Sequence, residues 1–174
     1  MSDPRYPVGR FERPAAVSTA DRQQFLTAIQ NTPTMLRAAV EGLDDAQLDT
    51  PYRDGGWTLR QVIHHLPDSH VNAYVRCKLA LTEEQPTIKT YVEHRWAELP
   101  DGKSAPIEVS LLLLDATHRR WSACLGALPP EAFARQLLHP ESGPMSLDTL
   151  LALYAWHGRH HIAHVTELRR QRGW

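Results

Sequence analysis

The C-terminal segment from Tyr154 to His164 places four histidines within eight positions of a strongly helical stretch, and this concentration of imidazoles restricts the fold more than any other feature. Residues four apart lie on one face of a helix. One such face reads Leu150, Tyr154, His157, His161, Val165 and Leu168. Imidazoles buried in an apolar stripe without partners cost on the order of 1–3 kcal/mol each. The fold must therefore supply partners for His157 and His161, either hydrogen-bonding groups or a shared metal ion.

Four segments show helical periodicity, and no stretch alternates as a β-strand does. Their expected ranges are 18–40, 58–82, 106–128 and 146–170. Ser18 with Asp21 and Thr58 with Gln61 match capping-box patterns, and Ser146 is the expected cap of the last helix. Four long helices then make up the whole architecture. The expected fold is all-α, a four-helix up-and-down bundle with a long loop between its second and third helices, and residues 1–174 form one domain.

The segments before and between the helices lack the same long helical periodicity. Residues 1–17 contain three prolines and few periodic apolar positions, which predicts an extended arm laid over the body. Residues 83–106 lose periodicity and gain prolines beside Tyr91 and Trp96, so we expect a long excursion anchored by aromatic side chains. Residues 129–136 are expected to add a short helical turn, and residues 139–144 to form a loop.

Composition excludes several classes of partner. Nineteen basic against twenty acidic side chains give a formal net charge of -1, so nothing attracts the chain to nucleic acid. No apolar run approaches the roughly 20 residues of a membrane span, and the N-terminus lacks a secretory signal. We therefore expect no nucleic-acid or membrane partner and a cytoplasmic location. Cys77 and Cys124 are isolated and are interpreted as buried thiols rather than nucleophiles.

The histidine pattern predicts a metal site. His157 and His161 lie on the apolar face of the last helix, whereas His160 and His164 continue towards Glu167 and Gln171, which is typical of a solvent-facing surface or the rim of a site. We therefore favour His157 and His161 as ligands of one divalent cation, with nitrogens at about 2.0–2.1 Å from it.

A third ligand is expected from the pair His64 and His65 in the second helix. His64 aligns with the polar residues of that helix, so His65 is the residue expected to point inward. Pro67 follows closely and removes a helical amide, so a kink could either aim His65 or shift its register. Asp68 is the candidate to accept a hydrogen bond from a ligand ring, although a solvated surface acid is an equal alternative.

The remaining histidines and the tryptophans give weaker signals. His70, His94, His118 and His139 each stand alone in their segments and are interpreted as structural or exposed, with His94 placed to overhang a pocket. The tryptophans at positions 57, 96, 121 and 156 fit a bundle core better than a pocket lining and are left unassigned.

The chain resembles the DinB superfamily, and within it the YfiT group of metal-dependent hydrolases. The resemblance spans nearly the whole chain and rests on four motifs, Tyr6–Phe11, Pro51–His70, Lys78–Glu83 and Tyr154–His164. It implies a four-helix bundle that holds one zinc or nickel ion, with His65, His157 and His161 at the positions of the ligands. Pro67 departs from the alanine more usual at its position.

The resemblance also implies an activity. Related proteins include bacillithiol S-transferases that act as homodimers, so the expected function is a metal-dependent hydrolase or thiol S-transferase with a small-molecule thiol or a hydrolysable substrate. No glutamate stands at the position that would mark an HExxH metallopeptidase. Zinc is the first expectation for the metal and nickel the second, since imidazole suits both. The alternative is a non-catalytic module in which the metal only joins two helices.

Overall fold

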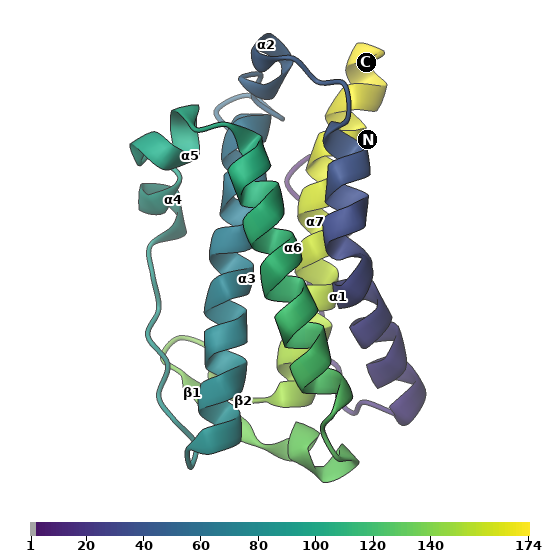
Figure 1. Cartoon of the computed structure of the whole chain (residues 1–174), viewed down its shortest axis with the longest axis vertical. Coiled ribbons are helices and arrows are strands. Elements are labelled where there is room, and N and C mark those ends of the chain that lie inside the picture. Colours follow the sequence, from purple (N-terminus) through teal and green to yellow (C-terminus); the bar gives the residue numbers. More distant parts are fainter. Residues whose placement is uncertain (1–2) are drawn as a thin grey trace.

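Four long helices form the body of the molecule in the computed structural model, which describes residues 3–174. They are α1 (Thr19–Val40), α3 (Leu59–Thr82), α6 (Ile107–Gly126) and α7 (Leu147–Arg172). Figure 1 shows them lying side by side along the long axis of the molecule. The expectation of an all-α four-helix bundle is confirmed.

The helices begin where the sequence places their caps. The Ser18 hydroxyl accepts from the Asp21 amide, and the Thr58 hydroxyl accepts from the Gln61 amide; both form complete capping boxes. Ser146 caps α7 through the amide of Thr149. At the other end of α7, Gly173 adopts a left-handed conformation with φ of 71°, which suits glycine and ends the helix.

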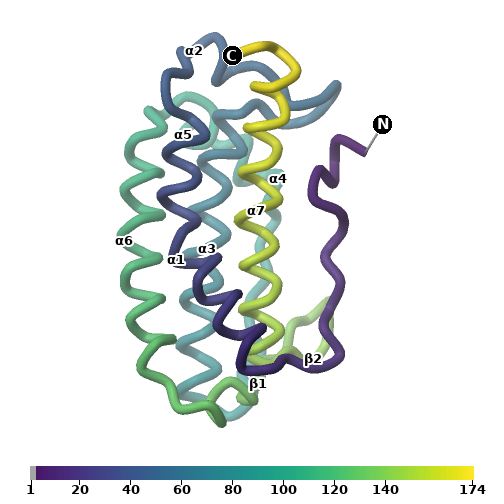
Figure 2. Tube along the Cα trace, turned by 90° about the vertical axis from the view of Figure 1, so that its right-hand side faces the viewer, coloured from purple at the N-terminus to yellow at the C-terminus, as the bar shows by residue number. Residues whose placement is uncertain are grey.

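The order of the helices around the bundle differs from the simple up-and-down order expected from the sequence. α1 packs against α6 and α7, and α3 packs against the same two helices, so α1 and α3 lie diagonally opposite. Figures 1 and 2 show that α3 and α6 run in the same direction, while α1 and α7 run in the opposite one. The physical reason is the long connection from 83 to 106, which returns the chain along the bundle before α6 begins.

The connections contain more structure than the sequence indicated. α2 (Asp45–Leu48) lies between α1 and α3, and the excursion from 83 to 106 holds α4 (Glu93–Trp96) and α5 (Pro100–Ser104). The expected turn after α6 is the 3-10 helix η1 (Pro130–Ala134).

A β-hairpin precedes α7, where a plain loop was expected, so the prediction that four helices are the whole architecture is wrong in this detail. β1 (Gln136–His139) pairs antiparallel with β2 (Gly143–Ser146), with Leu137 opposite Met145. Both side chains are buried in the core. The strands are too short for a periodicity signal, and their stability comes from this distant packing, which the local sequence does not reveal.

The core divides into two apolar clusters with a polar layer between them. One cluster contains Ile29, Ala73, Trp121 and Ala155, and the other contains Leu36, Leu66, Leu114 and Ile162. Each helix contributes one of these residues to each cluster, and the two residues are seven positions apart in all four helices: 29 and 36, 66 and 73, 114 and 121, and 155 and 162. The buried polar residues of this interval include Thr32, Ser69, His70, Thr117, His118 and His161. A polar layer two helical turns deep thus crosses the bundle.

The helices α1 and α7 approach closely at this layer. A Cβ atom on Gly158 would lie 2.7 Å from Oγ1 and 3.0 Å from Cγ2 of Thr32, distances that real Cβ atoms hardly ever show. The absence of a side chain at position 158 therefore sets how closely α7 packs against α1.

The N-terminal arm lies along α7, as expected, and Figure 2 shows it running beside the bundle before α1 begins. The indole of Trp156 donates to the Gly9 carbonyl at 3.1 Å, and Arg13 donates to the Pro144 carbonyl at 2.6 Å. Among residues 3–174, none of the helices combines the length and the apolar character needed to cross a membrane.

Candidate metal centre

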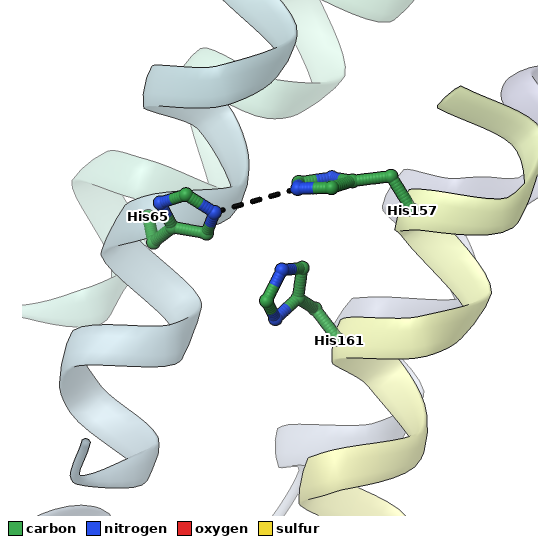
Figure 3. A group of neighbouring side chains, drawn as sticks. All are labelled: His65, His157 and His161. Atoms are coloured by element: carbon green, nitrogen blue, oxygen red, sulfur yellow. Dashed lines mark hydrogen bonds between the residues drawn. The ribbon is translucent and has the colours of Figure 1, made fainter. Parts of the chain in front are cut away.

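Three imidazoles from two helices meet at the polar layer. His65 projects from α3, and His157 and His161 project from successive turns of α7 (Figure 3). The Nε2 atoms of His65 and His157 are 3.4 Å apart, and one nitrogen from each of the three rings lies within 4.8 Å of the others. The structure thus brings together all three residues that the sequence singled out as ligands.

The convergence follows from local sequence and helix packing. The i, i+4 spacing places His157 and His161 on one face of α7, and that face packs against α3. Pro67 lies inside α3, but the helix continues unbroken from Leu59 to Thr82. The proline therefore leaves His65 pointing into the bundle, and the shift in register considered in the sequence analysis does not occur.

Burial keeps the three rings neutral. It lowers the pKa of His65 to about 4, and it lowers the pKa values of His157 and His161 well below the ordinary histidine value. Each ring also disfavours a positive charge on its neighbours. Neutral imidazoles carry the lone pair that a metal requires, so the donors are in the right protonation state at neutral pH.

The geometry fits a tetrahedral cation. Two nitrogens that each lie about 2.1 Å from a metal at the tetrahedral angle are about 3.4 Å apart. That is the distance between the Nε2 atoms of His65 and His157. Figure 3 shows a nitrogen of His161 directed between those two rings. The other nitrogen of this ring, Nδ1, is buried without a hydrogen-bond partner within residues 3–174, so the ring has no competing structural role.

His160 and His164 are buried, which corrects the alternative of a solvent-facing surface, while both line the cleft beside the three rings, in line with the alternative of a site rim. Their side chains leave only 7% and 4% of their surface exposed. Trp156 stacks on His160 at 4.4 Å between ring centroids, and Tyr52 stacks on His164 at 4.1 Å. The N-terminal arm and the connection before α3 also cover these rings, and the periodicity of one helix could not show that contribution.

A second group of three histidines shares one residue with the first. Nitrogens of His160, His161 and His164 also lie within 4.8 Å of one another. Burial lowers the pKa of His164 to about 4, and the positive charge of Arg53 adds to the shift. The same positive charge disfavours a cation at this second group.

Two buried histidines behind His157 complete the polar layer, a role that was not predicted from the sequence. His70 Nε2 lies 3.2 Å from His157 Nδ1, and His70 Nδ1 lies 2.7 Å from His118 Nε2. His118 Nδ1 in turn lies 2.6 Å from the Ile29 carbonyl oxygen. One signal was available, since His118 recurs at helical spacing among apolar residues of α6, where a polar ring needs a buried partner.

Asp68 and His64 take no part in the cluster. Asp68 does not line the cleft, and its carboxylate accepts no hydrogen bond within residues 3–174. Burial and the charge of Asp101 raise the pKa of Asp68 to about 6. His64 faces α6 instead, where its ring nitrogens lie 2.7 Å from Ser110 Oγ and 3.1 Å from the Ala105 carbonyl. It is a structural histidine with both nitrogens partnered.

A cleft of about 790 Å³ opens beside the three rings. Trp57, Tyr91 and His94 line it, as do Arg5, Arg76 and Ser69. His94 therefore overhangs the site as expected. Ser69 Oγ lies 3.5 Å from both His157 Nε2 and the Tyr154 hydroxyl, so hydroxyl groups stand next to the nitrogen cluster. The space suits a small molecule that reaches the rings from one side.

Comparison with known proteins gives consistent matches over the whole chain. The model of the DinB superfamily matches residues 28–165. Relatives from Bacillus mycoides (strain KBAB4) and Bacillus cereus (strain B4264), each named as an inferred metal-dependent hydrolase, are 49% identical over 174 residues and are covered completely, as is this chain.

Two solved structures share the fold. YfiT from Bacillus subtilis, described as "a probable metal-dependent hydrolase with an unusual four-helix bundle topology", matches with a TM-score of 0.95 and 47% identity over 98% of both chains. TT2238, a four-helix bundle protein, matches with a TM-score of 0.56 and 21% identity over 88% of this chain and 99% of its own, a likeness of fold alone.

Proposed function

Because this chain belongs to the DinB superfamily, we propose that it is a metal-dependent enzyme in which His65, His157 and His161 hold one divalent cation. The observation that carries the proposal is the meeting of three neutral imidazoles beside an open cleft, two of them at tetrahedral spacing. The names of the relatives support a metal-dependent activity of this kind. Zinc is the first choice for the cation and nickel the second, because imidazole suits both.

When bound, a cation held by three neutral ligands keeps its full charge and supplies an electrophilic centre that makes water or a thiol more acidic. The chain's own groups would then orient the substrate. Burial raises the pKa of Tyr91 to about 12, so its hydroxyl keeps its proton and can donate a hydrogen bond in the cleft. Ser69 and Tyr154 offer further hydroxyl groups next to His157.

We infer that the nucleophile is a low-molecular-weight thiol, in the manner of a bacillithiol S-transferase. Glu93 and Glu141 line the cleft, but within residues 3–174 no carboxylate hydrogen-bonds to the three rings. A thiol has a pKa near 8.5 and needs far less help to ionise than water. The sulfur would bond to an electrophilic carbon, the leaving group would depart with the bonding electrons, and the thiol proton would pass to solvent.

Hydrolysis is the second candidate, because the curated relatives and YfiT are described as hydrolases. In that reaction water would attack in place of the thiol. The same cleft would hold a small hydrolysable substrate, and the same three histidines would be required.

The experiment compares zinc-loaded protein, chelated protein and His65→Ala. Each sample is given bacillithiol with a chloronitrobenzene acceptor, and separately a nitrophenyl ester. Thiol-dependent release of chloride by the loaded protein alone supports the transferase, and ester cleavage by the loaded protein alone supports the hydrolase. Equal rates in all three samples would contradict an enzymatic role and leave the metal-binding module as the alternative.

A matched variant controls for general damage to the cleft. His94→Ala also removes a cleft imidazole, but it lies outside the three-ring cluster. It should retain stoichiometric zinc, whereas His65→Ala should lose it. We further propose a homodimer in the cytoplasm, as the family resemblance implies; light scattering on the purified protein tests the dimer.

A further inference from the structure

A row of buried hydrogen bonds leads from the proposed metal site to a main-chain carbonyl on the far side of the bundle. It passes from His157 on α7 to His70 on α3, then to His118 on α6, and ends at the oxygen of Ile29 on α1. His70 and His118 are 0% and 1% exposed, and neither lines the cleft. The row therefore links all four helices behind the site.

The carbonyl fixes the direction of every hydrogen bond in the row. A carbonyl oxygen only accepts, so Nδ1 of His118 must donate to it. A neutral imidazole has one N–H, which leaves Nε2 of His118 as an acceptor for Nδ1 of His70. By the same logic Nε2 of His70 accepts from Nδ1 of His157. Nε2 of His157 is then left with a lone pair.

The rings must be neutral for this logic to hold, and their surroundings ensure it. Three imidazoles in contact, with no carboxylate among their hydrogen-bond partners within residues 3–174, would repel any added proton. A charge on them would also be removed from water at great cost.

The acceptor at the end of the row exists because of a proline. In a regular helix the Ile29 carbonyl would accept from the amide of residue 33. Residue 33 is proline, which has no amide hydrogen, so this oxygen is free of its helical partner. His118 takes the vacated place at 2.6 Å. Pro33, which lies inside α1, thereby supplies the fixed end of the row.

We propose that His118 and His70 are positioning residues that hold His157 as its Nδ1–H tautomer and so direct an Nε2 lone pair into the metal site. The proposal rests on the proposed function in taking His157 as a ligand. Figure 3 shows the consequence, since the ring nitrogen that faces His65 is the one the row leaves unprotonated. Metal ligands commonly need such a partner on their second nitrogen, and the partner here is another histidine rather than a carboxylate.

The first test reads the tautomers directly. In protein labelled with ¹⁵N in its histidines and stripped of metal, the ring nitrogens are assigned by two-bond proton–nitrogen spectra at pH 7. His157, His70 and His118 should each be protonated on Nδ1 and not on Nε2. Finding His157 protonated on Nε2 in the unaltered protein would overturn the proposal. This reading does not depend on metal binding, so failure to bind zinc would remove the proposed function without deciding the tautomers.

The second test cuts the row. His118→Phe keeps an aromatic ring in the core but removes both hydrogen bonds, so the Nε2–H form of His157 should appear in the spectra. The dissociation constant for zinc, measured against a coloured chelator, should rise about 10–100-fold, the usual effect of losing an outer hydrogen-bond partner. An unchanged tautomer with an unchanged zinc constant would contradict the proposal.

His64→Phe is the matched control. His64 is also buried, lies on α3 and has both nitrogens partnered, but it is not part of the row. It should lower the melting temperature without changing the His157 tautomer or the zinc constant. A tautomer change as large as that of His118→Phe would show that any core damage suffices, and would overturn the proposal.

Pro33→Ala keeps the test decisive if His118→Phe fails to fold. The restored amide would compete with His118 for the Ile29 oxygen, while the helix itself becomes more regular. We expect a higher melting temperature together with a zinc constant weakened a few-fold. A purely structural role for the row predicts a higher melting temperature with an unchanged zinc constant, and that result would count against a positioning role.

Discussion

The apolar clusters and the polar layer between them make different demands on the sequence. In the clusters, Leu66, Leu114 and Trp121 are fully buried and contribute mainly through the apolar area they remove from water. In the layer, each side chain depends on a particular partner, as His118 does on the Ile29 carbonyl. The comparison teaches that the apolar ends of the bundle hold the fold together, while the buried polar groups of its middle cost stability unless each has its partner.

The largest effect should come from replacing a ligand. His161→Leu removes one of the three donors and also removes a ring whose Nδ1 is buried without a partner within residues 3–174. Zinc affinity should fall by more than about a hundredfold, since loss of an outer partner alone costs about 10–100-fold. Metal-free protein should unfold at the same or higher urea concentration. A large loss of metal-free stability would contradict the division between the layer and the clusters.

A truncation in an apolar cluster should lower the stability of the protein but leave its zinc affinity unchanged. Leu114 is fully buried on α6, so Leu114→Ala should lower the free energy of unfolding by about 2–5 kcal/mol. Because Leu114 belongs to a cluster and not to the layer, the zinc constant of the folded fraction should not change. Urea unfolding and chelator competition on the same sample measure both quantities. A weakened zinc constant would show that the clusters also position the site.

The close approach of α1 and α7 offers a smaller and more local test. Gly158→Ala gains up to about 1 kcal/mol in helix propensity, but the new methyl group would lie 2.7 Å from Thr32 Oγ1, and such overpacking typically costs about 1–3 kcal/mol. We expect a net loss of up to about 2 kcal/mol in the free energy of unfolding, measured with urea. The double variant Thr32→Ala, Gly158→Ala should recover most of it. Strictly additive losses would mean that the two residues do not clash.

What the sequence reveals depends on how far apart the interacting groups lie along the chain. Helix starts were predictable, because Ser18 and Thr58 bond to amides three residues away. The spacing of four residues predicted that His157 and His161 lie on the same face of their helix. The resemblance to a known family indicated His65, although the register of its helix near Pro67 was uncertain. Local patterns therefore gave the helices and two of the three rings, and the family resemblance supplied the third.

The misses all involve partners that lie far away in sequence. The burial of His160 and His164 comes from Tyr6, Trp156 and Tyr52, two of which lie outside α7. The hairpin depends on packing into the core, and the row from His157 to Ile29 needs four helices in place. His70 and His118 are structural, one of the two alternatives given for them, but their hydrogen-bond partners were not predicted because they belong to other helices.

The smallest expected change in stability concerns Asp68, which the sequence suggested as a hydrogen-bond acceptor for a ligand ring. Its pKa rises from 3.8 to about 6 because of burial and the charge of Asp101. The folded protein therefore binds the Asp68 proton more tightly than the unfolded chain does, which favours folding at low pH. This contribution is lost as pH rises from about 4 to 6, and above that the ionised carboxylate destabilises the fold.

Asp68→Asn removes this charge. Discounted for partial exposure of the side chain, the gain in the free energy of unfolding at pH 7 should be about 1 kcal/mol, and it should vanish at pH 4. Urea unfolding at the two pH values measures it, and the zinc constant should stay the same. If Asp68 instead accepted a hydrogen bond from a ligand ring, Asp68→Asn would raise the dissociation constant for zinc and would not raise the free energy of unfolding. That outcome would show that Asp68 supports the metal site and would contradict the absence of a contact between them.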